Sequence, residues 1–258
     1  MTMSPLLRLL GRGAVAGAIA GLLSAVVSFL LGEPSVRRAI ELEEAAAHAA
    51  GDAEHAEVFS RATQQGALFL VAMLTGLALG ILFALVYALR QQRDPDADAW
   101  RRSLLLAVAG LVGIALIPFL RYPANPPAVG DPATVDARTT AYLASILIGV
   151  AAVTAAVQLH RRLTDHGVRP PLRQLATLGV VVVGLASTWL LPDNADVIEV
   201  PADLIWDFRL ASIATLLVLW LGLGAIFGLL GERAERGVAS EDRPRRLLGR
   251  SVGADPVD

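Results

Sequence analysis

Long apolar runs that are almost free of charged residues dominate this sequence of 258 residues. Each run is about 20 residues long, and a helix of that length crosses the roughly 30 Å hydrocarbon core of a bilayer. The runs cover residues 13–31, 66–89, 103–120, 141–159, 172–191 and 210–230. The sequence therefore predicts an all-α integral membrane protein with about six transmembrane helices.

Composition excludes several other classes of protein. The chain is 55% hydrophobic and 18% charged, with a mean hydropathy of +0.57, which excludes a disordered chain and disfavours an ordinary soluble domain. A net charge of -2 gives no basis for binding nucleic acid. Cysteine is absent, which removes disulfides and thiolate metal sites. The sequence also lacks a Gly-x-x-x-x-Gly-Lys phosphate loop, so any ATP hydrolysis would belong to another chain.

The positions of the arginines predict how the helices are oriented. All 22 basic residues are arginine, and most lie at the N-terminus, in the connections 90–102 and 161–173, and after residue 230. Short basic loops stay in the cytoplasm. The other three connections carry more acidic than basic residues. We therefore expect both termini in the cytoplasm and an acidic outer face.

The chain divides into a membrane domain, residues 1–236, and a polar tail, 237–258, which we expect to be a disordered cytoplasmic segment. The first outer connection, 34–65, is rich in Ala and Glu and predicts an amphipathic helix outside the membrane. The second, 121–137, has too many prolines for a helix, so we expect a rigid loop. The third, 192–208, is an acidic loop that also contains proline.

Two of the predicted helical hairpins share a pattern. Each has a proline where the outgoing helix ends, then an outer loop, then an Asp-x-Arg sequence, at Asp136 and Arg138 in one hairpin and at Asp207 and Arg209 in the other. The first hairpin resembles them only loosely. Either the chain contains three repeated helical hairpins, or the similarity is coincidence among Ala-rich helices.

Glycines recur at four-residue spacing within three of the apolar runs. Small residues at this spacing allow helix backbones to approach closely in lipid. The glycines are Gly13, Gly17, Gly21, Gly76, Gly80, Gly224 and Gly228. They predict a compact bundle or a homo-oligomer. No ionisable residue lies at the middle of any run, which disfavours a proton-coupled pump or an intramembrane enzyme, and we expect no enzymatic activity.

The first outer connection holds a candidate metal site. His48, Asp52 and His55 have spacings of four and three, which place them on one face of a helix. Imidazole with carboxylate suits divalent cobalt, nickel or zinc. We predict that Pro34 ends the first helix and frees backbone carbonyls beside the carboxylate of Glu33, which creates an oxygen-rich site for a dication. His48 or His55 would complete this site as a nitrogen ligand. The alternative is that the histidines lie on a solvated acidic face.

Charged residues at the outer ends of the helices form a second candidate site. Arg138 and Arg209 stand at the starts of two predicted helices, where the helix dipole repels a cation, so a carboxylate should compensate each of them. The set comprises Arg61, Asp136, Arg138, Asp207 and Arg209. It predicts either a structural ion-pair cluster or a substrate gate. Glu33 would belong to the cluster if it paired with Arg61 or Arg138.

Four segments of the chain resemble the CbtA family: Gly32-Glu33-Pro34, residues 60–66, residues 118–132 and residues 200–212. The most specific is the string Tyr-Pro-Ala-Asn-Pro-Pro-Ala-Val-Gly-Asp-Pro. It contains Tyr122, Pro123, Asn125, Pro126, Pro127 and Asp131. The resemblance runs from about residue 8 to 232. It implies a probable cobalt-transporter subunit of the bacterial plasma (inner) membrane that works beside a small one-helix partner with a His-rich end, CbtB.

The leading hypothesis is a membrane subunit of a divalent-cobalt uptake system, with cobalt as substrate and no permanently bound cofactor. Its acidic outer face would concentrate cations over a pore mouth built by the Pro-rich loops. The alternative is a non-transporting scaffold that organises a small partner membrane protein in the lipid bilayer.

Overall fold

The structure is a computed structural model that describes residues 4–50, 60–93, 98–127, 129–130, 132–194 and 200–250. All regular secondary structure in these ranges is helical. The α-helices are α1 (Pro5–Val27), α2 (Glu33–Ala50), α3 (Arg61–Arg93), α4 (Ala99–Gly110), α5 (Ile117–Arg121), α6 (Val135–Asp165), α7 (Pro170–Ser187) and α8 (Ala202–Arg250). The shorter elements are two π-helical segments, Ser28–Gly32 and Leu111–Leu116, and two 3-10 turns, Pro132–Thr134 and Thr188–Leu190.

Six helical stretches of the described chain are long and apolar enough to cross a membrane. They are Pro5–Ala49, Arg61–Arg93, Ala99–Arg121, Val135–Asp165, Pro170–Leu190 and Ala202–Ala234. The first joins α1 to α2, and the third joins α4 to α5, each through a π-helical segment. The predicted all-α, multi-pass membrane protein is confirmed. Three repeated hairpins are not confirmed and stay a prediction.

The predicted helix end at Pro34 is wrong, because α1 continues into α2 through the π-helical segment. The backbone N–H of Glu33 donates to the carbonyl oxygen of Ser28, five residues earlier. A proline ring clashes with the carbonyl four residues before it, and a turn widened by one residue accommodates the ring. The same arrangement precedes Pro118 at the junction of α4 and α5. The expected cluster of freed carbonyls at residues 29–32 therefore does not follow from Pro34.

The predicted outer connections contain both helix and loop. Residues 34–65 are helical in α2 and again from the start of α3, and residues 51–59 lie outside the described chain. In 121–137, the chain is non-helical from Tyr122 to Pro127, and α6 begins at Val135.

Helix α8 differs from the predicted boundaries at both ends. It begins at Ala202, inside the predicted loop 192–208, and continues to Arg250, where a disordered tail was expected from residue 237. The helical part of the tail contains four arginines and two leucines, which are favourable residues in a helix.

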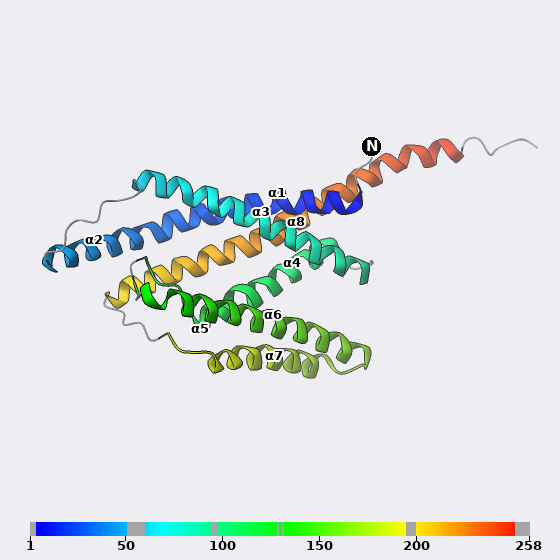
Figure 1. Cartoon of the computed structure of the whole chain (residues 1–258). Coiled ribbons are helices and arrows are strands. Elements are labelled where there is room, and N and C mark those ends of the chain that lie inside the picture. The colour runs from blue at the N-terminus through cyan, green and yellow to red at the C-terminus, as the bar shows by residue number, and fades with distance from the viewer. Residues whose placement is uncertain are drawn as a thin grey trace, which may run out of the picture.

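Figure 1 shows that the chain reverses direction at each connection, so that the helix ends gather in two groups. One group contains the start of α1, the end of α3, the start of α4, the end of α6 and the start of α7. We call this group the basic end. The other contains the end of α2, the start of α3, the end of α5, the start of α6, the end of α7 and the start of α8. We call it the loop end.

Glycines bring α1 and α3 into backbone contact within one chain. A Cβ atom added to Gly17 would overlap the carbonyl oxygen of Gly76, and one added to Gly76 would overlap the carbonyl oxygen of Gly17. Gly13 and Gly80 form the same kind of pair one turn away. The predicted glycine packing therefore serves the bundle itself. A further pair that the spacing pattern did not single out, Gly113 with Gly149, joins the second π-helical segment to α6.

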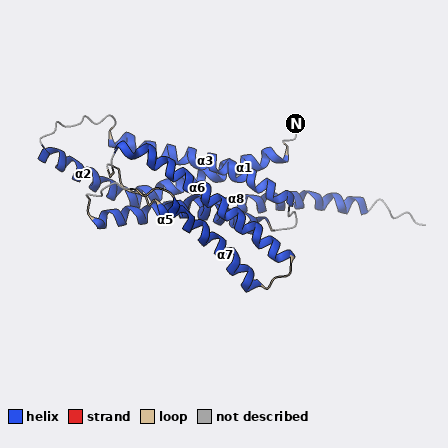
Figure 2. Cartoon of the chain, turned by 60° about the horizontal axis from the view of Figure 1, so that its bottom comes forward, coloured by secondary structure: helices blue, strands red, loops and turns tan. Residues whose placement is uncertain are grey.

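The core lies between α1, α3, α4 and α8. Its buried residues are Ala16, Ala20, Phe83, Ala84, Tyr87, Ala107, Leu223 and Phe227. Small side chains from α1 and α4 face aromatic rings from α3 and α8, so the helices pack at short distances. Helix α7 packs mainly on α6 and lies at the periphery of the bundle (Figure 2).

Candidate functional site

The Pro-rich loop after α5 is bound to the segment after α7 by one arginine. Arg121 donates from Nε to the carbonyl oxygen of Thr188 (3.1 Å), and from Nη2 to those of Leu191 (3.0 Å) and Pro192 (3.1 Å). Nη2 also pairs with Oδ1 of Asp193 at 2.5 Å. The Arg121 side chain is 9% exposed. Next to it, the Tyr122 hydroxyl donates to the carbonyl oxygen of Pro192 at 2.6 Å. Two loops far apart in sequence are therefore joined at the loop end.

Helix α8 is bound to the same Pro-rich loop through Arg209. Its Nε donates to the carbonyl oxygen of Ala124 (3.3 Å) and its Nη2 to Oδ1 of Asn125 (3.0 Å). The expected carboxylate partner, Asp207, does not pair with Arg209. Two helical residues of separation rotate a side chain by about 200°, so the two side chains leave α8 on opposite faces. Neutral loop oxygens therefore take the place of the predicted carboxylate.

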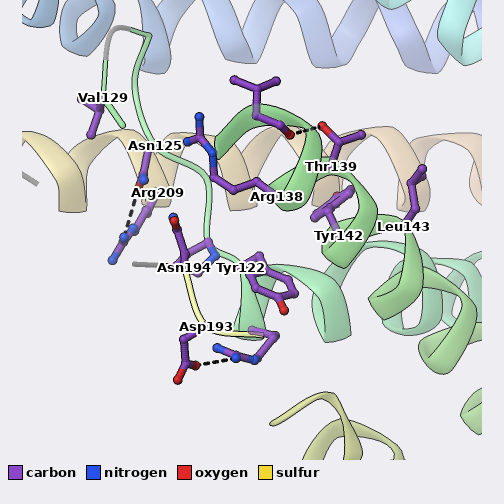
Figure 3. A pocket seen from close by; sticks show the side chains of 13 residues that line it. Tyr122, Asn125, Val129, Arg138, Thr139, Tyr142, Leu143, Asp193, Asn194 and Arg209 are labelled. Carbon is purple, nitrogen blue, oxygen red and sulfur yellow. Dashed lines mark hydrogen bonds and ion pairs between the residues drawn. The ribbon is translucent and has the colours of Figure 1, made fainter. Parts of the chain in front are cut away.

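A cavity of about 590 Å³ lies between this loop, α6 and α8. Figure 3 shows Arg209 beside Asn125, with Arg138, Thr139 and Tyr142 coming from α6. The lining residues are Arg121, Tyr122, Pro123, Asn125, Val129, Val135, Arg138, Thr139, Tyr142, Leu143, Asp193, Asn194 and Arg209. The structure thus brings together Arg138, Arg209 and part of the predicted loop motif.

Glu33 lies in a separate cluster at the loop end, where α2 meets the start of α3. Its Oε1 accepts from Nη2 of Arg61 (2.5 Å), Nε2 of Gln65 (2.8 Å) and Nε of Arg37 (3.3 Å). The Glu33 side chain is 11% exposed, so its charge depends on these donors. Of the two alternatives, the structure shows Glu33 as the ion-pair partner of Arg61.

The proposed metal ligands do not come together. Glu33 and His48 lie on one continuous helix, 15 residues apart, which separates them by about 22 Å along its axis. His48 therefore cannot complete a site at Glu33, and the prediction that it does so is wrong. Asp52 and His55 lie outside the described residues, as does Asp131 of the loop motif. Within the described ranges, no group of three His, Cys, Asp or Glu side chains is placed to hold a metal ion.

Sequence reasoning did not single out Arg121, Asp193 or Tyr142 as site residues. The sequence could have indicated Arg121, because it lies on the predicted outer side, whereas most arginines of the chain lie on the predicted cytoplasmic side. Asp193 meets Arg121 across 72 residues of sequence, and Tyr142 enters the cavity lining from α6. No local sequence pattern indicates either position.

Arg209 and Asn125 should be energetically coupled. Replacing Arg209 by alanine should destabilise the protein by about 1.5 kcal/mol, because it removes a charge-assisted hydrogen bond to the loop. Once Arg209 is absent, Asn125→Ala should reduce stability little further, because the bond between the two residues is already lost. Asp207→Ala should instead reduce stability by the same small amount whether or not Arg209 is present. Thermal unfolding in detergent of the single and double variants measures both couplings. Strong coupling to Asp207 and none to Asn125 would contradict the structure.

Comparison with known proteins identifies a family. The family model described as "Probable cobalt transporter subunit (CbtA)" matches residues 6–232. The matched region contains all six candidate spans almost completely, together with the cavity at the loop end. No curated protein and no solved structure matches the chain.

Proposed function

The chain belongs to the CbtA family of probable cobalt transporter subunits, and from this premise we propose that it is the membrane subunit of a divalent-cobalt uptake system. The family match carries this proposal, because it spans the entire set of six membrane-crossing helices. The arrangement of the bundle supports it. At the loop end, the arginine-bound segments after α5 and α7 border a cavity that can receive a cargo from one side of the membrane.

A small one-helix membrane partner with a His-rich end, CbtB-like, is part of the proposal. The described residues of this chain contain no grouped metal ligands, and a His-rich partner would supply the nitrogen ligands that cobalt favours. In this account the partner collects the metal, while the six-helix subunit provides the passage through the bilayer.

Cobalt accumulation in cells separates this function from a scaffolding role. Bacterial cells that lack their own cobalt importers would express the chain, the His-rich partner, or both, and radiolabelled cobalt would be counted in the cells. A transport subunit predicts accumulation that requires the chain. Equal accumulation with the partner alone, at an equal amount of partner in the membrane, would favour the scaffold and contradict the proposal.

The proposed orientation places the basic end in the cytoplasm of a bacterial cell and the loop end outside. Since the chain has no cysteine, single-cysteine variants report sidedness without background. A membrane-impermeant maleimide should label Ser60→Cys at the loop end in intact spheroplasts. It should label His166→Cys, between α6 and α7, only after permeabilisation. Labelling of His166→Cys but not Ser60→Cys in intact spheroplasts would show the opposite orientation.

A further inference from the structure

The cavity at the loop end carries positive charge, although the sequence predicts a mouth that concentrates cations. Among its described lining residues are three arginines, Arg121, Arg138 and Arg209, and one carboxylate, that of Asp193. Asp193 already pairs with Arg121. The described lining therefore has a positive formal charge, which favours an anionic ligand over a bare dication.

Arginine is suited to a different ligand class. Its planar guanidinium binds carboxylates through two parallel hydrogen bonds, which fixes both the position and the orientation of the group. The bonds of Arg209 to Ala124 and Asn125 use two of its five N–H donors. Asn125 accepts through Oδ1, which leaves its Nδ2 group able to donate. The Tyr142 hydroxyl adds a further donor in the lining.

The size of the cavity fits a small organic molecule. Its volume of about 590 Å³ falls within the range of about 300 to 1,000 Å³ that is usual for small-molecule sites. Its walls are mixed, with Val135 and Leu143 beside the arginines. The surrounding loops are held to each other by Arg121 and to α8 by Arg209, so the site does not depend on an unsupported loop.

We propose that this cavity binds a small carboxylate-bearing molecule, and that cobalt reaches the protein as the complex of such a molecule. Carboxylate oxygens ligate divalent metals, and a polycarboxylate such as citrate keeps a net negative charge when it holds one dication. The complex therefore brings cobalt into an arginine-lined site in a form that the site favours over the bare ion. The binding of a carboxylate is inferred from the cavity alone, whereas the delivery of cobalt as its complex rests on the proposed function.

Calorimetry on the purified, detergent-solubilised chain tests the site with three probes: citrate, the cobalt–citrate complex and cobalt chloride. Citrate and the complex should bind, and cobalt chloride should not bind at the cavity. Arg138→Gln and Arg209→Gln should each weaken citrate binding by about tenfold or more, because each removes a charge-assisted contact. Arg38→Gln is the matched control. Arg38 lies at the same end, half exposed, and pairs with Asp203 at 2.8 Å without lining the cavity.

The outcomes separate the site from the transport function. If Arg209→Gln fails to fold, Arg138→Gln and Arg209→Lys still test the site, since lysine keeps the charge but loses the two-pronged geometry and should bind more weakly than wild type. Citrate binding that is absent, or equal in every variant, would overturn the proposal. Cobalt uptake that is unaffected by citrate would overturn the complex as cargo. If cells take up cobalt neither alone nor as the citrate complex, although the chain still binds citrate, the proposed function would be contradicted. The proposed carboxylate site would then remain.

Discussion

Replacing Gly76 by alanine should destabilise the protein by about 2 kcal/mol, although alanine is the better helix former. The added Cβ would overlap the carbonyl oxygen of Gly17 and lie against the Cα atom of Gly21. Both obstacles are backbone atoms of α1, so no side chain can rotate to make room. Helices α1 and α3 would have to separate, and the core residues between them would lose contact.

A second glycine provides the control for this prediction. Gly179 lies within α7, and a Cβ added there would meet no atom within 4 Å. Gly179→Ala should therefore leave stability unchanged or raise it by up to about 1 kcal/mol. Thermal unfolding of both variants in detergent measures the difference. A Gly76→Ala variant as stable as Gly179→Ala would show that α1 and α3 do not meet at these glycines.

Arg61→Ala should produce a loss of similar size at the loop end. It removes the closest donor to the Glu33 carboxylate, which is nearly buried. The free energy of unfolding should fall by about 3 kcal/mol, because a desolvated charge is left poorly compensated. Changing Glu33 to alanine in the same chain should recover part of that loss, since the stranded charge is removed with its partner.

Arg38→Ala is the comparison for this pair. Arg38 and Asp203 are 49% and 61% exposed, and an exposed ion pair of this kind contributes about 1 kcal/mol or less. Thermal unfolding of Arg61→Ala, Glu33→Ala, the double variant and Arg38→Ala gives the comparison. Additive losses at Glu33 and Arg61 would exclude a structural pair. A stable Glu33→Gln variant that no longer takes up cobalt would restore Glu33 as a metal ligand.

The parts of the fold that sequence predicts are those that depend on local pattern. Six crossings follow from the length of the apolar runs, and the spacing of the glycines indicates close helix packing, although it does not show that α1 and α3 are the pair that meets. The helix continuing through Pro34 was not predictable in this way. The bulge before it needs a turn that is one residue wider, and Gly32 in that turn packs near Ala211 of α8, a contact distant in sequence.

The candidate site was predicted less well, for reasons that its residues show. Charge alone suggested that Asp207 would compensate Arg209, but the helical period places the two side chains on opposite faces, and the partner comes from a loop 84 residues away. The acidic composition of the outer connections suggested a cation-attracting mouth. The cavity is lined instead by arginines, because the three helices α5, α6 and α8 bring them to one place.

Cobalt entry into proteoliposomes tests the central claim most directly. The purified chain and its His-rich partner would be reconstituted in vesicles that contain a cobalt-quenched dye, with cobalt supplied outside both alone and with citrate. The account predicts quenching that requires the six-helix chain and is faster with citrate. Vesicles that contain the folded chain and its partner, but admit cobalt no faster than vesicles with the partner alone, would contradict it.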